Sequence, residues 1–382
     1  MNTLRVIYQH AKKGPLPLGR LAYKQGIAYL EFDADFLTLG LNLSPLQLKL
    51  NSQLQAAQRA PFQGLHGVFS DSLPDGWGVL LMDRYFRQQG LSLADINPLD
   101  RLAYMGNRAM GALSYQPDLG DDQTHQDLLV LDIVAQEALA VYQGTSEEVA
   151  QYLRIIGGSP GGARPKAIIG LKGESAMTDN GALPDDYEHW LIKLPTAQTK
   201  AAQAEGAVEY VFALLARKAG IEFPETRLIS AHEHAGFFAC KRFDRGLEQQ
   251  RVHMHSLAGM INADYRVPDA DYELLMKATS HITKSHQDLC EVLRRMIFNI
   301  LSGNRDDHTK NFSYLMSEEG EWSLSPAYDM TFNYGINGQH SMSIMGHGRN
   351  IPKSAVQAIA GLIPLSPTKV DNMIAEIIEA LS

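Results

Sequence analysis

The stretch Asn304-Arg-Asp-Asp-His-Thr-Lys-Asn-Phe312 is the most informative part of the sequence. It follows RRMIFNILSG (294–303), an apolar run with helical spacing. Two carboxylates, a histidine, a lysine and two amides occupy these nine positions, and such a density of polar and ionisable groups is typical of a functional site. The alternative interpretation is a polar connection between a helix and a loop.

The spacing within this stretch is that of a kinase catalytic loop. Asp306 and Asn311 form D-x-x-x-x-N, in which the Asp accepts the proton of the substrate hydroxyl and the Asn holds Mg²⁺. Further along, Asp329 in LSPAYDMTFNYG (324–335) offers the hard oxygen ligand that Mg²⁺ prefers, although no DFG motif is present. Taken alone, Asp329 is explained equally well as a turn residue.

A glycine-rich segment, Gly157-Gly-Ser-Pro-Gly-Gly-Ala-Arg-Pro-Lys166, joins a predicted helix to a β-branched strand. Its glycines would allow backbone N–H groups to approach phosphates closely. The segment matches neither a Walker A motif nor G-x-G-x-x-G, so a simple tight turn explains it equally well.

Lys193 lies inside the apolar strand sequence WLIKLP (190–195), where a charge needs a partner. The helix that follows offers Glu205 and Glu209, and Glu209 is the better candidate because it stands among apolar neighbours. The alternative is that the lysine extends to solvent. A glycine loop, a strand lysine, a helix glutamate, D-x-x-x-x-N and a later Asp follow one another in the order that phosphoryl transfer requires.

Length and composition set the limits of the fold. A chain of 382 residues with 45% hydrophobic residues predicts a globular protein of two lobes. The net charge of −9 argues against autonomous binding to a nucleic-acid backbone. No apolar run reaches the length of a membrane helix, and no secretory signal is recognisable, so we expect no membrane association. The two cysteines, Cys240 and Cys290, cannot form a disulfide framework, which favours a cytoplasmic setting.

Hydrophobic periodicity predicts an α+β arrangement of two lobes, in which strands dominate the N-terminal part and helices the C-terminal part. Strands are expected at the N-terminus (4–10 and 19–33), a helix over 43–55, and a helix capped by Asp75 whose Trp77 packs on the N-terminal strands. The expected domains are a β-rich subdomain (1–120), a kinase N-lobe (121–244) and a helical C-lobe (245–382).

The sequence resembles the HipA family, serine/threonine kinase toxins of bacterial type II toxin–antitoxin systems. The similar stretches extend over nearly the whole chain in family order: SLPDGWG (72–78), GGARPKA (161–167), WLIKLP (190–195), AVEYVFALLARKAGIEFPETRLI (207–229), KRFDR (241–245), GNRDDHTKNF (303–312) and LSPAYDM (324–330). The sequence departs from the family in Lys241, where Glu is frequent, and in Val208, where Asn is usual.

The resemblance implies an α+β, two-lobed protein-kinase-like fold with a β-rich N-terminal lobe and a mainly helical C-terminal lobe, and it implies a role for each matching residue. Asp306 would be the catalytic base, Asn311 and Asp329 would hold Mg²⁺, and Glu209 would pair with Lys193. Ser159 matches the serine that family members autophosphorylate to inactivate themselves. The residues implied to bind ATP are Gly161, Gly162, Ala163, Arg164, Pro165, Lys166, Lys193, Lys241, Arg242, Phe243, Asp244, His308, Thr309, Lys310, Asn311, Tyr328 and Asp329.

The resemblance also implies partners. A HipB-like helix-turn-helix antitoxin would bind the chain and would make most of the contact with operator DNA, and an aminoacyl-tRNA synthetase would be a possible protein substrate. Two other functions remain open from the sequence: a small-molecule kinase on the same scaffold, and a catalytically silent module that only binds an antitoxin. The H-x-H pair His253 and His255 suggests a metal site, but no third ligand follows at a convincing spacing.

Overall fold

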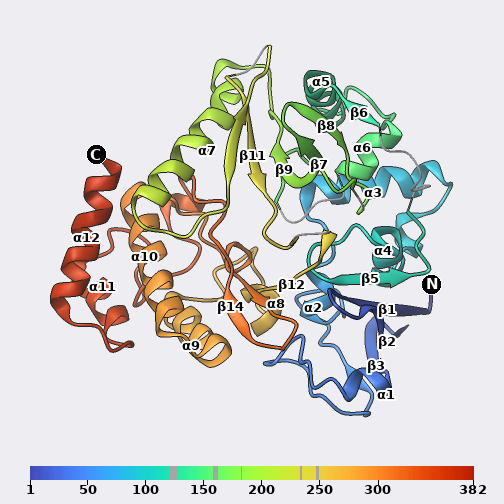
Figure 1. Ribbon diagram of the computed structural model, residues 1–382, viewed down its shortest axis with the longest axis horizontal. Coiled ribbons are helices and arrows are strands. Elements are labelled where there is room, and N and C mark those ends of the chain that lie inside the picture. The colour runs from blue at the N-terminus through green and yellow to red at the C-terminus, as the bar shows by residue number, and fades with distance from the viewer. Residues whose placement is uncertain (121–126, 158–161, 182, 233–234, 247–248) are drawn as a thin grey trace.

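The computed structural model describes residues 1–120, 127–157, 162–181, 183–232, 235–246 and 249–382. Within them the chain builds a β-rich subdomain, a lobe around a second sheet and a helical lobe (Figure 1). Ser159 and Gly161 lie outside the described residues. The α+β, two-lobed class that the sequence predicts is confirmed.

The N-terminal subdomain is a five-stranded antiparallel sheet in the order β4-β3-β2-β1-β5. Apolar and polar residues alternate along the first strands, so one face packs into a core while the other meets solvent. The strands are β1 (Thr3–His10), β2 (Gly14–Lys24), β3 (Ile27–Phe32), β4 (Gln55–Ala56) and β5 (Leu113–Gln116), and the helices are α1 (Ala34–Leu37), α2 (Gly67–Ser70), α3 (Gly76–Gln88) and α4 (Pro98–Met105).

The helix predicted over 43–55 is wrong: apart from β4, which begins at Gln55, turns occupy this segment. Asn42 accepts a hydrogen bond from the backbone N–H of Ser44 and donates to the carbonyl of Leu48, which favours a local turn. The Ser44 hydroxyl does not cap a helix but lies 3.0 Å from Nε2 of His255. Local hydrogen bonds of Asn42 and a distant partner of Ser44 therefore both stabilise the turn in this segment.

The second sheet has the order β10-β11-β9-β7-β8-β6, with every neighbouring pair antiparallel. In Figure 1, α7 lies beside β11, while α5 and α6 lie near β8 and β7. The elements are β6 (Leu128–Leu129), β7 (Lys166–Lys172), β8 (Ser175–Thr178), β9 (Glu188–Lys193), β10 (Thr226–Ile229), β11 (Phe237–Lys241), α5 (Leu131–Tyr142), α6 (Gln151–Ile156) and α7 (Lys200–Lys218).

Trp77 does not pack on the N-terminal strands as predicted. Its indole is buried in the core of the second sheet, and its Nε1–H donates to the carbonyl of Lys166 at 3.0 Å. Helix α3, which the sequence assigns to the N-terminal subdomain, therefore also forms part of the core beside the glycine-rich segment.

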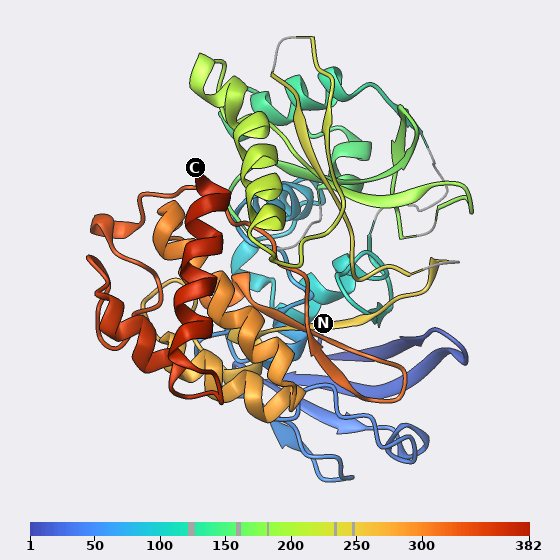
Figure 2. The same ribbon diagram turned by 60° about the vertical axis from the view of Figure 1, so that its left-hand side comes forward.

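The C-terminal lobe is mainly helical, as predicted, and Figure 2 shows α12 and α10 side by side. A three-stranded sheet of order β12-β13-β14 was not foreseen. The elements are β12 (His253–Ser256), α8 (Leu257–Ile261), α9 (Tyr272–Thr283), α10 (His286–Ser302), β13 (Ser313–Met316), β14 (Trp322–Leu324), α11 (Lys353–Ala360) and α12 (Pro367–Leu381). Among the described helices, none is both long and apolar enough to cross a bilayer.

Strand β12 joins the C-terminal lobe to the N-terminal subdomain through its two histidines. Nε2 of His253 lies 3.0 Å from the carbonyl of Leu43, and Nδ1 of His255 lies 2.6 Å from the carboxylate of Asp71. In the described part of the chain, no group of three or more His, Cys, Asp and Glu residues is arranged to hold a metal. The histidines are therefore explained by interlobe packing.

The buried His253 predicts a loss of stability in mild acid. Burial lowers its pKa to about 4, so between pH 6.5 and 4 the unfolded chain binds a proton that the folded chain excludes. The contribution of neutral His253 to the unfolding free energy is complete above the pKa that the residue has in the unfolded chain. This contribution falls by about 1 to 2 kcal/mol as the pH drops from 7 to 5. Thermal melts at the two pH values check this. His253→Gln, which keeps an N–H donor, should have a smaller difference in melting temperature between the two pH values. An equal difference in the variant and the wild type would contradict the assignment of this pH dependence to His253.

Candidate active site

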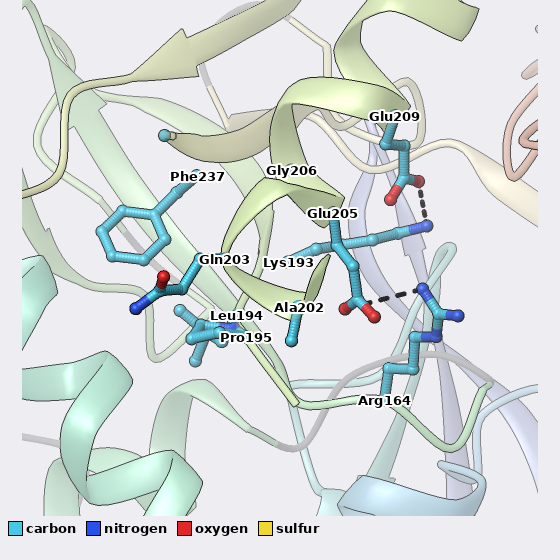
Figure 3. A pocket seen from close by; sticks show the side chains of 11 residues that line it. Arg164, Lys193, Leu194, Pro195, Ala202, Gln203, Glu205, Gly206, Glu209 and Phe237 are labelled. Carbon is cyan, nitrogen blue, oxygen red and sulfur yellow. Dashed lines mark hydrogen bonds and ion pairs between the residues drawn. The ribbon is translucent and has the colours of Figure 1, made fainter. Parts of the chain in front are cut away.

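The ammonium group of Lys193 lies at the meeting point of three segments. Lys193 ends β9, and its Nζ donates to the carboxylates of Glu209 on α7 and Asp329 after β14. Figure 3 shows the lysine side chain extending to Glu209 along the wall of a pocket that also contains Glu205 and Arg164. The predicted pairing of Lys193 with Glu209 is present in the structure, and Asp329 is a second partner.

The two carboxylates keep this lysine charged. Burial opposes the ionised form, but Asp329 and Glu209 together raise the pKa of Lys193 above its usual value. Burial likewise opposes ionisation of Asp329, yet Lys193 and Lys166 hold the pKa of that carboxyl well below its usual range. Burial raises the pKa of Glu209 against the pull of Lys193. At neutral pH the group therefore contains an ionised lysine beside an ionised aspartate.

A second lysine approaches the same place from the glycine-rich segment. Lys166 stands opposite Lys193 in the β7–β9 register and is 5% exposed. Burial lowers its pKa, although Asp329 opposes the shift. Gly162 has φ +101°, and a Cβ on it would lie 2.5 Å from the Lys166 Nζ. The positive φ favours glycine at this position, and a larger residue would also displace the Lys166 ammonium.

The catalytic-loop sequence begins where α10 ends. Gly303 takes the left-handed conformation at the C-cap, and the chain then turns through Asn304 towards the short helix η3 (Thr309–Asn311). The Asn304 amide donates to the backbone carbonyl of Asp329 at 3.3 Å, and its Oδ1 accepts from the N–H of Asp306 at 3.3 Å. One side chain therefore links the segment of the predicted base to the segment of the predicted metal ligand.

Asp306 is exposed, so its carboxylate is accessible from solvent. Its Oδ2 accepts a hydrogen bond from the Asn333 amide at 3.2 Å. The Asn311 amide donates to the backbone carbonyl of Asp306 at 2.7 Å, which leaves the Asn311 carbonyl oxygen as a possible ligand. With the ionised Asp329, the loop thus offers two oxygen donors of the type that Mg²⁺ prefers, and the residues fit the implied cation.

The sequence did not single out Asp307 as a site residue, yet its buried side chain holds this loop through hydrogen bonds to other segments. It is 1% exposed, and its carboxylate accepts from the Tyr272 hydroxyl at 2.7 Å and from the backbone N–H of Ser341 at 2.9 Å. His340 Nδ1 lies 2.9 Å from the same carboxylate. Burial and the nearby Asp307 raise the pKa of Tyr272 well above its usual value, so its hydroxyl remains a donor. The partners lie far from Asp307 in sequence, so no local pattern marks them.

Other predicted nucleotide residues lie in different settings. Phe243 and Tyr328 face each other with ring centroids 5.8 Å apart, which joins the segment after β11 to the Asp329 segment. Lys241 forms an ion pair with Glu188 at 2.5 Å. Thr309 is 3% exposed, beside His308, whose ring lies 5.6 Å from that of Tyr265.

Asp244 and Arg242 belong to a buried ion-pair cluster. Asp244 is 0% exposed and accepts from Arg242, from Arg245 and from the backbone N–H of Gly111. Burial opposes its ionisation, but the two arginines hold its pKa well below its usual range. Because this carboxylate is enclosed, it ties the lobe connection to the N-terminal subdomain and offers no surface to a ribose.

Comparison with known proteins identifies the family. The HipA-like C-terminal domain family matches residues 158–382, which is more than half of the chain, and the HipA N-terminal domain family matches residues 11–116. The chain belongs to the HipA family. The family predicted from the sequence is thereby confirmed.

Individual relatives agree with this assignment. A protein of Sinorhizobium fredii named putative kinase Y4dM is 30% identical over 37% of this chain and 36% of its own length. A putative kinase of Haemophilus influenzae is 29% identical over 45% of this chain and 52% of its own length. The chain therefore spans only about a third to a half of these relatives. HipA of Shewanella oneidensis MR-1, solved with HipB and operator DNA, has a TM-score of 0.68 at 17% identity, covering 98% of this chain and 88% of that one, and so shares the fold.

The two neighbouring aspartates should respond differently to loss of charge. Asp307→Asn replaces one accepting oxygen with an N–H₂ group, which would face hydrogen-bond donors and could not accept from them. We expect a loss of about 2 to 3 kcal/mol in unfolding free energy. Asp306→Asn alters an exposed side chain and should change the unfolding free energy by less than about 0.5 kcal/mol. Chemical denaturation of both variants measures the difference. Equal stability of the two variants would contradict the anchoring role of Asp307.

Proposed function

We propose that this protein is an ATP- and Mg²⁺-dependent serine/threonine protein kinase and acts as the toxin of a toxin–antitoxin pair. The observation that carries the proposal is the Lys193–Glu209–Asp329 ion-pair group, whose Asp329 segment is hydrogen-bonded to the loop that contains Asp306 and Asn311. A strand lysine paired with a helix glutamate, next to a D-x-x-x-x-N loop, is the arrangement that kinases use for phosphoryl transfer.

In the proposed mechanism, catalysis consists of positioning and charge neutralisation. Lys193 and Lys166 present ammonium groups to the triphosphate, and the backbone beside Gly162 allows close approach. Asp306 accepts a hydrogen bond from the acceptor hydroxyl and takes up its proton. Asn311 and Asp329 would hold Mg²⁺, which neutralises phosphate charge when bound.

For the adenine end of ATP, we propose the backbone from Lys241 to Phe243 together with the Tyr328 ring. Aromatic rings supply large apolar contact area to a planar base. We leave the side chains of Asp244 and Arg242 out of the nucleotide contacts, because both are buried in the ion-pair cluster. The other residues that we propose to bind the nucleotide are Gly161, Ala163, Arg164, Pro165, His308, Thr309 and Lys310.

Exposed apolar side chains beside Asp306 favour a protein as the phosphoryl acceptor over a small molecule. Phe332, Tyr334 and Ile336 are 57%, 68% and 75% exposed. Phe332 and Tyr334 flank Asn333, whose amide donates a hydrogen bond to Asp306, and Ile336 follows two positions after Tyr334. Aromatic and aliphatic side chains that surround a reactive group provide contact area for a peptide segment, whereas a metabolite binds in an enclosed pocket. This observation weakens the small-molecule alternative, and the intact Lys193, Asp306, Asn311 and Asp329 weaken the silent-module alternative.

The proposed partner is a HipB-like helix-turn-helix antitoxin, since the Shewanella HipA was solved with HipB and operator DNA. The net charge of −9 is consistent with DNA contact made mainly by that partner. We further propose a translation-related substrate such as an aminoacyl-tRNA synthetase, a cytoplasmic location, and autophosphorylation of Ser159. A phosphate on Ser159 would add a charge of about −1.5 to −2 to the glycine-rich sequence and would oppose the binding of the negatively charged nucleotide.

Radiolabelled ATP tests the kinase proposal directly. The wild-type chain with Mg²⁺ should label itself and protein in a bacterial lysate, while Asp306→Asn should lower the transfer rate by at least about 100-fold, because the acceptor proton then has no base. Nucleotide binding should remain within about threefold, because Asp306 contacts the acceptor and not ATP.

The matched control is Ser159→Ala, which should transfer phosphate to lysate protein but lose self-labelling and stay active over time. Asp306→Asn labelling as fast as wild type would reject the assignment of the base. Self-labelling that persists unchanged in Ser159→Ala would reject the autophosphorylation site alone.

The apolar surface beside Asp306 predicts an effect on the acceptor alone. Ile336→Ser removes apolar contact area and should raise the acceptor concentration needed for half-maximal labelling by about fivefold or more. The ATP concentration for half-maximal rate should not change. Ile378→Ser on α12, where the isoleucine is 52% exposed, is the control and should behave as wild type. Identical kinetics for both variants would exclude this surface as an acceptor contact.

A further inference from the structure

The start of helix α3 contacts both the catalytic loop and the glycine-rich segment, the two segments proposed to bind the phosphates. Asp75 is the N-cap residue of α3, as the sequence predicts, but its side chain makes no capping hydrogen bond. Its Oδ2 accepts instead from the Lys310 ammonium at 2.9 Å, and its Oδ1 accepts from the Tyr265 hydroxyl at 2.5 Å. A strongly favoured capping residue is thus used for a contact with the catalytic loop.

The Asp75–Lys310 ion pair is largely withdrawn from solvent. The two side chains are 17% and 12% exposed, and the Lys310 Nζ lies 4.6 Å from the centroid of the Tyr265 ring. Such partial burial strengthens the attraction and limits the number of positions that the ammonium can occupy. The carboxylate and the aromatic ring therefore fix where the Lys310 charge lies.

The same turn of α3 also contacts the glycine-rich segment. A Cβ on Gly76 would lie 2.5 Å from the Cα of Ala163, so the two backbones are in direct contact. The backbone N–H of Trp77 lies 3.5 Å from the carbonyl of Gly162, and its indole binds the Lys166 carbonyl. Residues 75–77 thus bridge the glycine-rich segment and the catalytic loop.

We propose that Asp75 is a positioning residue of the phosphoryl-transfer site, which acts by holding the Lys310 ammonium in place for the phosphates of ATP. This inference rests on the proposed function. It extends that function to the N-terminal subdomain, which contributes a side chain that the reaction requires. The backbone contacts of Gly76 and Trp77 keep Asp75 at a constant distance from the glycine-rich segment.

A purely structural ion pair is the competing explanation, and α3 provides a matched control. Asp83 on the same helix pairs with Arg101 at 2.7 Å, with side chains 24% and 18% exposed, comparable with Asp75 and Lys310. Both pairs link α3 to another segment, but only the Asp75 pair reaches the catalytic loop. Asp83→Asn therefore measures the effect of losing such a pair on stability alone.

The test is a double-mutant cycle on ADP production from Mg-ATP. Asp75→Asn keeps the shape of the side chain and should lower kcat about tenfold, because the lysine charge is displaced. Its KM for ATP should change less than about threefold. In the Lys310→Met background, Asp75→Asn should change kcat less than about twofold, since no ammonium remains to be positioned. Asp75→Glu should restore kcat to within about threefold of wild type, and Asp83→Asn should retain wild-type kcat.

Two results would overturn the proposal. One is an equal fall in kcat on Asp75→Asn with and without Lys310, and the other is loss of folding by Asp75→Asn in circular dichroism, because either shows a structural role independent of the lysine. A wild-type chain that neither binds nor turns over Mg-ATP would reject the proposed function, and this inference with it. If the wild-type chain is active but the effects of Asp75→Asn and Lys310→Met on kcat are additive, only the positioning role of Asp75 is rejected and the proposed function stands.

Discussion

The ammonium group of Lys193 is the constraint on which the rest of the site depends. A charge inside an apolar strand is tolerated only with partners, and the partners here come from α7 and from the segment after β14. This requirement brings the second sheet, its covering helix and the C-terminal lobe together at one point. Asn304 then connects Asp329 to the loop of Asp306, so the geometry of the candidate site follows from satisfying the partly buried charge of Lys193.

The N-terminal subdomain is built into this arrangement. Trp77 packs in the core of the second sheet, and the Asp71–His255 contact joins α2 and β12 at the centre of the molecule. Arg251 donates to the backbone carbonyls of Ala109, Gly111 and Leu113. Charged and hydrogen-bonded contacts of this kind are buried, so the lobes are held at specific positions and not merely linked by chain.

Local signals made part of this structure predictable. The strand alternation near the N-terminus, the α7 helix, and the pairing of Lys193 with Glu209 all depend on residues close in sequence. The features that were missed depend on distant partners. Asp75 and Lys310 are 235 positions apart, and Ser44 and His255 are 211 positions apart. A one-dimensional pattern contains no information about such contacts, which explains why the contact of the Asp75 cap with Lys310 was not foreseen and why a helix was expected at 43–55.

A crystal structure of the chain with a non-hydrolysable ATP analogue and Mn²⁺, located by its anomalous signal, would examine the central claim most directly. The cation should lie between Asn311 and Asp329, with phosphate oxygens at the Lys193 ammonium in place of one of its two carboxylate contacts. A nucleotide bound away from Lys193, or a cation without contact to either Asn311 or Asp329, would contradict the assignment of this site to phosphoryl transfer.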